Sequence, residues 1–274
     1  MSPLFKIPAA SGHLPIFKAG EQGIRWLGLE VVRLAAGERW QSSLEDEEAG
    51  LVILGGRCTV VVDAKERAEW AALGNRSDIF AGLPTAVYVP RRSTLSITAE
   101  TALEAAIMKA PCDVDLPPAL VTPADVKVIS AGMANWRRDV RLVIPPGSPI
   151  SQRLIIGETI NPPGNWSGIP PHKHDEITQA ENSLEEVYLF KAKPADGYGV
   201  QLMYRSGEGS AHLIGNDDVA VMLGGFHPTV AAPGVTIAYL WTLAGDSKAY
   251  NLSIDPRFSW VSSAEAVFRE MKQQ

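Results

Sequence analysis

The sequence lacks the features that mark several large classes of protein. It contains only two cysteines, Cys58 and Cys112, too few for a disulfide framework or a thiolate metal site. No stretch approaches the roughly 18 apolar residues expected of a membrane span. The start of the chain has no charged segment followed by an apolar run, as a secretory signal would. We therefore expect a cytoplasmic protein with no membrane partner.

Positive charge is also scarce. The chain has 25 Lys and Arg against 31 Asp and Glu, so its formal net charge is −6. A protein that binds nucleic acid through its phosphates usually carries a basic patch, and none is visible here. The charge balance predicts a small molecule or another protein as the partner and argues against nucleic acid.

Turn-forming residues are plentiful: 24 Gly and 20 Pro favour many short strands over long helices. A Pro-rich stretch, 111–123, is interpreted as a linker, and Ser262 and Ser263 would cap a short helix over 266–272. We predict an all-β fold with one C-terminal helix. Strand-like segments cover 24–34, 51–62, 86–89, 94–109, 140–144, 153–160, 186–191, 199–204, 219–222 and 236–243.

The two halves of the chain share an order of segments. Residues 29–40 (LEVVRLAAGERW) and 154–166 (LIIGETINPPGNW) each run from a strand through a turn of small residues to a tryptophan. An acidic segment and an apolar strand follow in both halves. This self-similarity predicts an internal duplication, with domains at 1–122 and 123–274.

Histidine is distributed unequally between these halves. Four of the five histidines lie in the second half, whereas the matching positions of the first half offer serine, alanine and arginine. We therefore expect the first domain to lack a metal site and to serve as scaffold or interface.

The sharpest local signal is the sequence PPHKHDE at 170–176. In a strand, residues i and i+2 point to the same face, about 6–7 Å apart. His172 and His174 could therefore converge on one cation. The alternative for such a pair is an ordinary solvated loop.

Glu186 and His227 strengthen the metal interpretation. Glu186 begins the apolar strand EVYLF, where alternation puts it on one face with Tyr188 and Phe190, and a buried carboxylate needs a partner. His227 closes another apolar run, although alone it would more often be a core histidine. Glu186 could instead lie in water at the end of its strand, and Glu176 or Glu181 could take its place. His212 is expected in a surface loop.

Together these residues resemble the cupins, whose first motif supplies HxH and a glutamate and whose second supplies one histidine. The resemblance is closer to the 5-deoxy-glucuronate isomerases of inositol catabolism. It covers most of residues 150–260 and only loosely the first half. The spacing of eleven residues between His174 and Glu186 is longer than in most cupins. The segments that carry the resemblance are 170–175 (PPHKHD), 184–190 (LEEVYLF), 221–228 (VMLGGFHP), 239–241 (YLW) and 251–258 (NLSIDPRF).

This resemblance implies two cupin domains, each a jelly-roll β-sandwich barrel. It implies that His172, His174, Glu186 and His227 hold a divalent metal, with zinc expected first and manganese second. It also implies an aldose–ketose isomerase that converts 5-deoxy-glucuronate to 5-dehydro-2-deoxy-gluconate, using the metal to stabilise an enediolate. A homo-oligomer is a further expectation.

The remaining roles rest on residue type and position. Glu158 and Tyr188 are candidates for the general base. A structural role is the alternative for each. For the substrate, a carboxylate calls for an arginine, and an aromatic side chain could line the pocket. Candidates for substrate binding are Arg153, Arg205, Arg257 and Tyr239.

Two other functions are compatible with the same ligands. One is an Fe(II)-dependent cupin dioxygenase, which would consume oxygen. The other is a non-catalytic sugar-binding cupin, which would bind metal without turning over any uronate.

Overall fold

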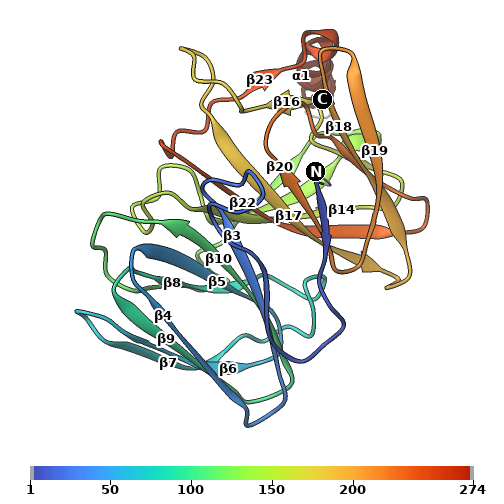
Figure 1. The fold of residues 1–274 in the computed structure, drawn as a ribbon. Coiled ribbons are helices and arrows are strands. Elements are labelled where there is room, and N and C mark those ends of the chain that lie inside the picture. Colours follow the sequence, from blue (N-terminus) through green and yellow to red (C-terminus); the bar gives the residue numbers. More distant parts are fainter. Residues whose placement is uncertain (1–2, 272–274) are drawn as a thin grey trace.

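The computed structural model describes residues 3–271, and most of them lie in β-strands (Figure 1). The predicted all-β fold is confirmed, because α1 (Trp260–Met271) is the only α-helix in this range. The helix begins ahead of the predicted cap at Ser262, and its predicted end, Lys272, lies outside the described residues. Within the same range no helix has the length and apolarity needed to cross a membrane.

The first half forms two antiparallel sheets. The larger sheet has the strand order β11-β8-β5-β10-β3-β2, and the smaller has the order β4-β9-β6-β7. The strands are β2 (Gly12–Phe17), β3 (Gly28–Leu34), β4 (Arg39–Leu44), β5 (Glu47–Gly55), β6 (Cys58–Asp63), β7 (Ala68–Leu73), β8 (Thr85–Val89), β9 (Ser93–Ala99), β10 (Leu103–Pro111) and β11 (Ala119–Val121).

The second half repeats this arrangement. Its sheets have the orders β1-β20-β17-β22-β14-β13-β12, β15-β21-β18-β19 and β16-β23. The strands are β1 (Leu4–Lys6), β12 (Lys127–Ala131), β13 (Arg138–Ile144), β14 (Ile155–Asn161), β15 (Trp166–Ser167), β16 (His172–Lys173), β17 (Leu184–Lys193), β18 (Tyr198–Arg205), β19 (Glu208–Gly215), β20 (Asp218–Met222), β21 (Thr229–Ala231), β22 (Thr236–Gly245) and β23 (Ser253–Ile254).

Three apolar cores lie between the sheets. One fills the first barrel, one fills the second, and the third lies between the two large sheets, so that each large sheet is covered on both faces. This explains why β5 is a continuous apolar run instead of an alternating one. On β17, Tyr188 and Phe190 face the second barrel, whereas Val187 and Leu189 face the junction. The predicted alternation of this strand is therefore confirmed.

One short strand from the start of the chain belongs to the second barrel. β1 comes from the start of the chain but pairs with β20 in the second barrel, which places the N-terminal segment against that half (Figure 1). The chain passes from the first barrel to the second between β11 and β12, because β11 pairs with β8 of the first barrel and β12 pairs with β13 of the second. The division of the chain at residue 122 stays a prediction.

Several predicted elements need correction. The expected strand 51–62 is two strands, β5 and β6, which turn at Gly56. The expected strand 94–109 is likewise split into β9 and β10. His212 lies within β19 instead of a loop, because the polar segment around it pairs along its full length with β18. The first two errors joined pairs of largely buried, apolar strands across a short turn, whereas β19 is largely exposed and gave too weak a hydrophobic pattern.

Candidate metal centre

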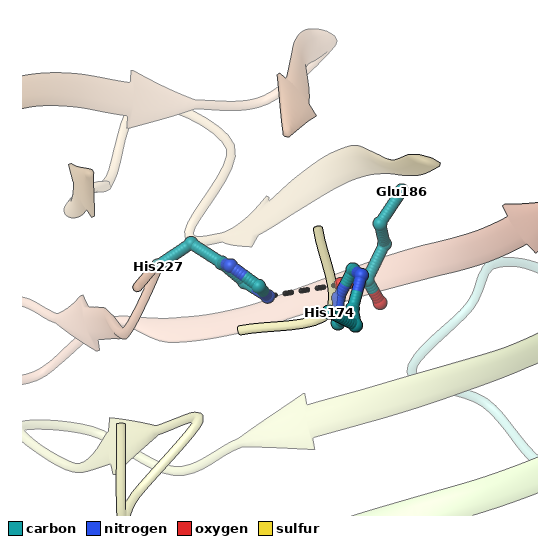
Figure 2. A group of neighbouring side chains, drawn as sticks. All are labelled: His174, Glu186 and His227. Carbon is teal, nitrogen blue, oxygen red and sulfur yellow. Dashed lines mark hydrogen bonds and ion pairs between the residues drawn. The ribbon is translucent and has the colours of Figure 1, made fainter. Parts of the chain in front are cut away.

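Three predicted metal ligands meet inside the second barrel. His174 follows β16, Glu186 stands near the start of β17, and His227 follows β20. Their ligand atoms all lie within 4.8 Å of one another, and each residue is buried. Glu186 Oε2 is 3.1 Å from Nε2 of His174 and 3.1 Å from Nε2 of His227, and the three side chains point toward one another (Figure 2).

Backbone carbonyls fix the orientation of both imidazoles. Nδ1 of His174 lies 2.8 Å from Leu184 O, and Nδ1 of His227 lies 2.8 Å from Gly225 O. A carbonyl oxygen only accepts hydrogen bonds, so each Nδ1 carries a proton and each Nε2 is free to offer a lone pair. Two Nε2 atoms facing one carboxylate require a proton or a cation between them. His227 Nε2 has no hydrogen-bond partner although it is buried, so a divalent cation fits this donor set.

A glycine turn delivers His227 to this position. Gly225 has φ +80°, and a Cβ on it would approach Tyr204 O to 2.8 Å, so only glycine fits. Its N–H donates to Asp175 Oδ2 at 2.5 Å, which ties this turn to the segment that follows His174. Two stretches that are distant in sequence are thereby held together at the metal ligands.

His172, the fourth predicted ligand, lies beside this group but outside its tightest part. Its ring centre is 5.2 Å from that of His227 and 6.3 Å from that of His174. Nδ1 of His172 lies 3.3 Å from Pro170 O, which follows the pattern of the other two histidines. His172 and Glu186 line the same cavity.

The electrostatics of the group follow from burial and pairing. Burial alone would raise the pKa of Glu186, but hydrogen bonding by His174 and the closeness of His227 lower it to about 2. Burial would lower the pKa of His174, yet its bond to Glu186 raises it. Burial and the neighbouring imidazoles hold the pKa of His172 well below its usual value. The site therefore contains one negatively charged carboxylate that is surrounded by imidazole nitrogens.

The cavity at this group is small, with a volume of about 80 Å³. A larger cleft of about 770 Å³ lies elsewhere. Several of its charged residues pair with one another, as in Arg33–Glu104 at 2.7 Å and Lys191–Asp217 at 2.7 Å, and it contains none of the candidate metal ligands. The small cavity is therefore the candidate site. Its lining residues are Arg138, Val140, Thr159, Ser167, Gly168, His172, Glu186, Tyr188, Tyr239, Trp241 and Tyr250.

Two predicted residues of the second barrel reach this cavity. Tyr188 and Tyr239 line it, with ring centres 4.4 Å apart, and Tyr239 Oη lies 2.5 Å from Ser167 Oγ. Burial raises the pKa of both phenols above the usual value of 10.0. The structure thus brings Tyr188 and Tyr239 together with the metal ligands.

Glu158 needs correction, because the structure places it on the opposite face of its strand. It is fully buried at the junction between the barrels. Its oxygens accept hydrogen bonds from Arg76 at 2.5 and 2.9 Å and from Arg141 at 3.2 Å. Thr159, the next residue along β14, is the one that lines the cavity. Alternation along a strand excludes Glu158 from the same face, so it does not reach the site.

The three predicted substrate-binding arginines also lie outside the cavity. Arg153 donates to Pro111 O at 3.0 Å and to Gly245 O at 2.9 Å. Arg205 pairs with Asp175, and Arg257 pairs with Asp255 at 2.7 Å. Each of these guanidinium groups already has a hydrogen-bond or ion-pair partner within the protein, and none is part of the cavity lining.

The choice among the acidic residues follows from their partners. Glu185 points away from Glu186 and accepts hydrogen bonds from the N–H groups of Arg25 and Trp26, each at 2.7 Å. Glu181 is buried but binds Lys173 Nζ at 2.9 Å and the backbone of its own loop. Among the glutamates considered for the site, Glu186 alone joins the histidine group.

Arg138 and Tyr250 are among the lining residues that sequence reasoning missed. The strand containing Arg138 was expected to begin at Val140, whereas β13 begins at Arg138. The alternation Arg138, Val140, Leu142 could have placed this arginine on the barrel face. Tyr250 comes from the loop between β22 and β23 and carries no local signal.

Comparisons with known proteins agree across nearly the whole chain. A model of the KduI/IolB family matches residues 9–261. The 5-deoxy-glucuronate isomerase of Geobacillus kaustophilus (strain HTA426) is 32% identical over 270 residues, which are 97% of this chain and 96% of that protein. The 5-deoxy-glucuronate isomerase of Bacillus subtilis (strain 168) is 28% identical over 87% of this chain and 88% of its own length.

Solved structures give the same picture of the fold. The crystal structure of an IolB-like protein from Salmonella typhimurium LT2 matches with a TM-score of 0.90 at 27% identity, covering 94% of this chain and 98% of that one. The oxalate decarboxylase of Lactobacillus farciminis matches with a TM-score of 0.68 at 11% identity, covering 95% of this chain and 90% of that one. The second match shows the fold alone and confirms the predicted double-barrel cupin architecture.

Proposed function

Because the chain belongs to the KduI/IolB family, we propose that it is an aldose–ketose isomerase of inositol catabolism that converts 5-deoxy-glucuronate to 5-dehydro-2-deoxy-gluconate. The relatives named above are 5-deoxy-glucuronate isomerases and match nearly the whole chain. The single structural observation that supports this activity is the buried group His174, Glu186 and His227, which lies against a cavity in the second barrel.

We propose that His172 completes this group, so that three imidazoles and one carboxylate hold a divalent metal. The carbonyl-bound Nδ1 atom of each histidine supports this assignment, because it leaves Nε2 for the metal. Zinc is the first candidate and manganese the second, since both accept this donor set. A cation held there would act as a Lewis acid toward a sugar carbonyl and its neighbouring hydroxyl.

The remaining chemistry falls to side chains of the cavity. Aldose–ketose isomerisation moves one proton between neighbouring carbons, which requires a group that holds a proton at that position. We propose Tyr188 for this role, because it lines the cavity two residues from Glu186, and a cation held there would favour the phenolate that burial alone disfavours. Tyr239 is packed against Tyr188, and its bond to Ser167 fixes the hydroxyl within the cavity. Apolar walls such as Val140 and Trp241 exclude water from the reacting carbons.

The size of the cavity requires an opening step. Small-molecule pockets commonly measure about 300–1,000 Å³, and this cavity of about 80 Å³ is narrower. Tyr250 lines it but is 39% exposed, so its loop stands where the cavity meets solvent. We propose that this loop shifts when the sugar acid binds.

The other two functions receive less support. The relatives named above are isomerases, and the oxalate decarboxylase similarity concerns the fold alone. A redox-neutral conversion under anaerobic conditions would exclude the dioxygenase. Turnover of any uronate would exclude the non-catalytic sugar-binding protein.

The test combines metal analysis with turnover. Purified protein is assayed with 5-deoxy-glucuronate under anaerobic conditions, before and after chelation and after restoration with zinc or manganese. The proposal predicts conversion that disappears with the metal and returns with it. Absence of conversion by the metal-loaded protein would refute it.

We further propose a cytoplasmic homo-oligomer, as the sequence and family resemblance suggested. The apolar side chains Trp260, Val267 and Met271 of α1 are each more than half exposed, which supports association through this helix. Light scattering of the purified protein would measure the mass: the monomer mass of 29.5 kDa would contradict the oligomer.

A further inference from the structure

Arg138 is the one arginine that lines the cavity next to the metal ligands. It opens β13, and alternation along that strand places it with Val140 and Leu142 on the face toward the second barrel. The same cavity is lined by His172 and Glu186. Arg138 therefore brings a permanent positive charge to the space where a substrate would bind.

The protein leaves this charge without an anionic partner. Arg138 Nη1 donates only to the backbone carbonyls of Trp136 at 3.3 Å and Ile169 at 3.2 Å. Within residues 3–271, no carboxylate forms an ion pair with it. A charged group facing a buried cavity is costly unless an opposite charge joins it, so the arrangement favours an incoming anion.

Other arginines of this half contrast with Arg138. Arg141, its neighbour on the opposite face of β13, is bound to Glu158. Arg205 and Arg257 are bound to Asp175 and Asp255. These guanidinium groups complete internal ion pairs, whereas that of Arg138 is held in place by neutral carbonyls.

We propose that Arg138 binds the carboxylate of the substrate and so selects sugar acids over neutral sugars. This inference rests on the proposed isomerase function. A sugar acid carries its carboxylate at the end opposite the aldehyde, so a cation must face the metal ligands across the same cavity. The planar guanidinium can donate two parallel hydrogen bonds to a carboxylate. Arg138 orients the substrate so that its carbonyl end meets His174, Glu186 and His227.

The test compares charged and uncharged ligands in three variants. Arg138→Gln removes the charge, Arg138→Lys keeps it without the planar fork, and Arg137→Gln is the matched control. Arg137 neighbours Arg138 but is exposed and binds Ser130 and Asp139 on the surface. The substrates are 5-deoxy-glucuronate and its carboxamide, and metal content is measured for every variant.

The proposal predicts a selective loss. Arg138→Gln should lower kcat/KM for the acid by about 30-fold, mainly through a higher KM, which is a loss of about 2 kcal/mol and is typical of a hydrogen bond to a charged group. The carboxamide should change by less than about threefold, and Arg138→Lys should lie between. Arg137→Gln should match the wild type. Equal losses for acid and carboxamide with Arg138→Gln, or no loss for either, would overturn the assignment.

A binding measurement separates this inference from the proposed function. If the wild type turned over no 5-deoxy-glucuronate, the proposed function would fail, and calorimetry with D-glucuronate and D-glucuronamide would still test Arg138. Tighter binding of glucuronate that disappears in Arg138→Gln, with metal content unchanged, would support the carboxylate site. Unchanged binding in that variant, or no binding by the wild type, would overturn it.

Discussion

The two barrels share a sheet arrangement but fill their interiors differently. In the first, β5 and β10 turn Leu51, Ile53 and Ile107 into an apolar core, and the buried Glu30 and Lys109 pair with each other at 2.6 Å. In the second, β17 and β22 turn polar and aromatic side chains inward, among them Glu186 and Tyr239. A close-packed apolar core leaves no room for a ligand, whereas buried polar groups need partners. The same architecture thus contains the candidate site in the second half, whereas the first half is predicted to serve as scaffold.

The junction between the barrels ties the first half to the sheet that carries Glu186. Its core joins both large sheets, and the buried pair Arg76–Glu158 crosses it at 2.5 Å. Glu48 of the first half also accepts hydrogen bonds from the N–H groups of Gln152, Arg153 and Leu154 at 2.7 to 3.0 Å. These contacts hold β14, which is part of the sheet that carries Glu186.

The largest expected effect lies in the second barrel. His174→Ala should abolish metal binding and lower kcat/KM at least about 1000-fold, because one of the buried ligands and its Lewis acid are lost. The variant should remain folded by circular dichroism. His13→Ala, in the first half, is the control and should retain its metal. Retained metal and full turnover in His174→Ala would remove the distinction between the barrels.

A second prediction concerns the junction. Glu158→Gln should lower the free energy of unfolding by about 3–5 kcal/mol, because it leaves the buried Arg76 without a counter-charge. Urea unfolding followed by circular dichroism measures this change, and metal content should stay the same. Unchanged stability together with lost turnover would restore Glu158 as a catalytic residue.

A pair of variants contrasts the two interiors directly. Leu51→Ala in the first barrel should cost about 2–5 kcal/mol of stability and leave the metal in place. Tyr188→Phe in the second should change stability by less than about 1 kcal/mol while lowering kcat at least about 100-fold. If Leu51→Ala lowered turnover strongly while leaving stability unchanged, the first barrel would also carry function, and this account would be contradicted.

The smallest effect concerns the segment that follows the second barrel. Hydrogen bonding by Arg257, with a contribution from Tyr204, lowers the pKa of Asp255 from 3.8 to about 2. A carboxyl whose pKa is depressed on folding stabilises the protein above the unfolded value, so this contribution is present above about pH 4 and is lost toward about pH 2. We expect about 1 kcal/mol, because the Arg257 side chain is 68% exposed.

Asp255→Asn tests this by denaturant unfolding at several pH values. The gap in unfolding free energy between wild type and variant should be full near about pH 6 and should shrink as the pH falls below about 4. A gap that is independent of pH would contradict the ion-pair explanation.

How far the sequence predicted the site depended on how local each signal was. His174 was singled out by its spacing from His172, and Glu186 and His227 were singled out because they sit on or after strongly apolar strands, where a polar residue stands out. Glu158 was misassigned although it also lies on a buried strand. Both faces of β14 are covered, and the sequence does not reveal which face meets the junction.

The fold was predicted where strands are central and missed where they lie at edges. Buried strands such as β17 and β22 gave continuous apolar runs, whereas β4, β7 and β19 are largely exposed and gave no clear period. The arginines show the same limit. An arginine's role depends on which carboxylate lies nearby in space, and pairs such as Arg205–Asp175 join residues that are distant in the sequence.

The most direct test of the central claim is anomalous diffraction from crystals of the metal-loaded protein, recorded on both sides of the absorption edge of the bound metal. We predict one anomalous peak per chain, placed between His174, Glu186 and His227 in the second barrel. A peak inside the first barrel, or none at the histidine group in protein that retains its metal, would contradict the account.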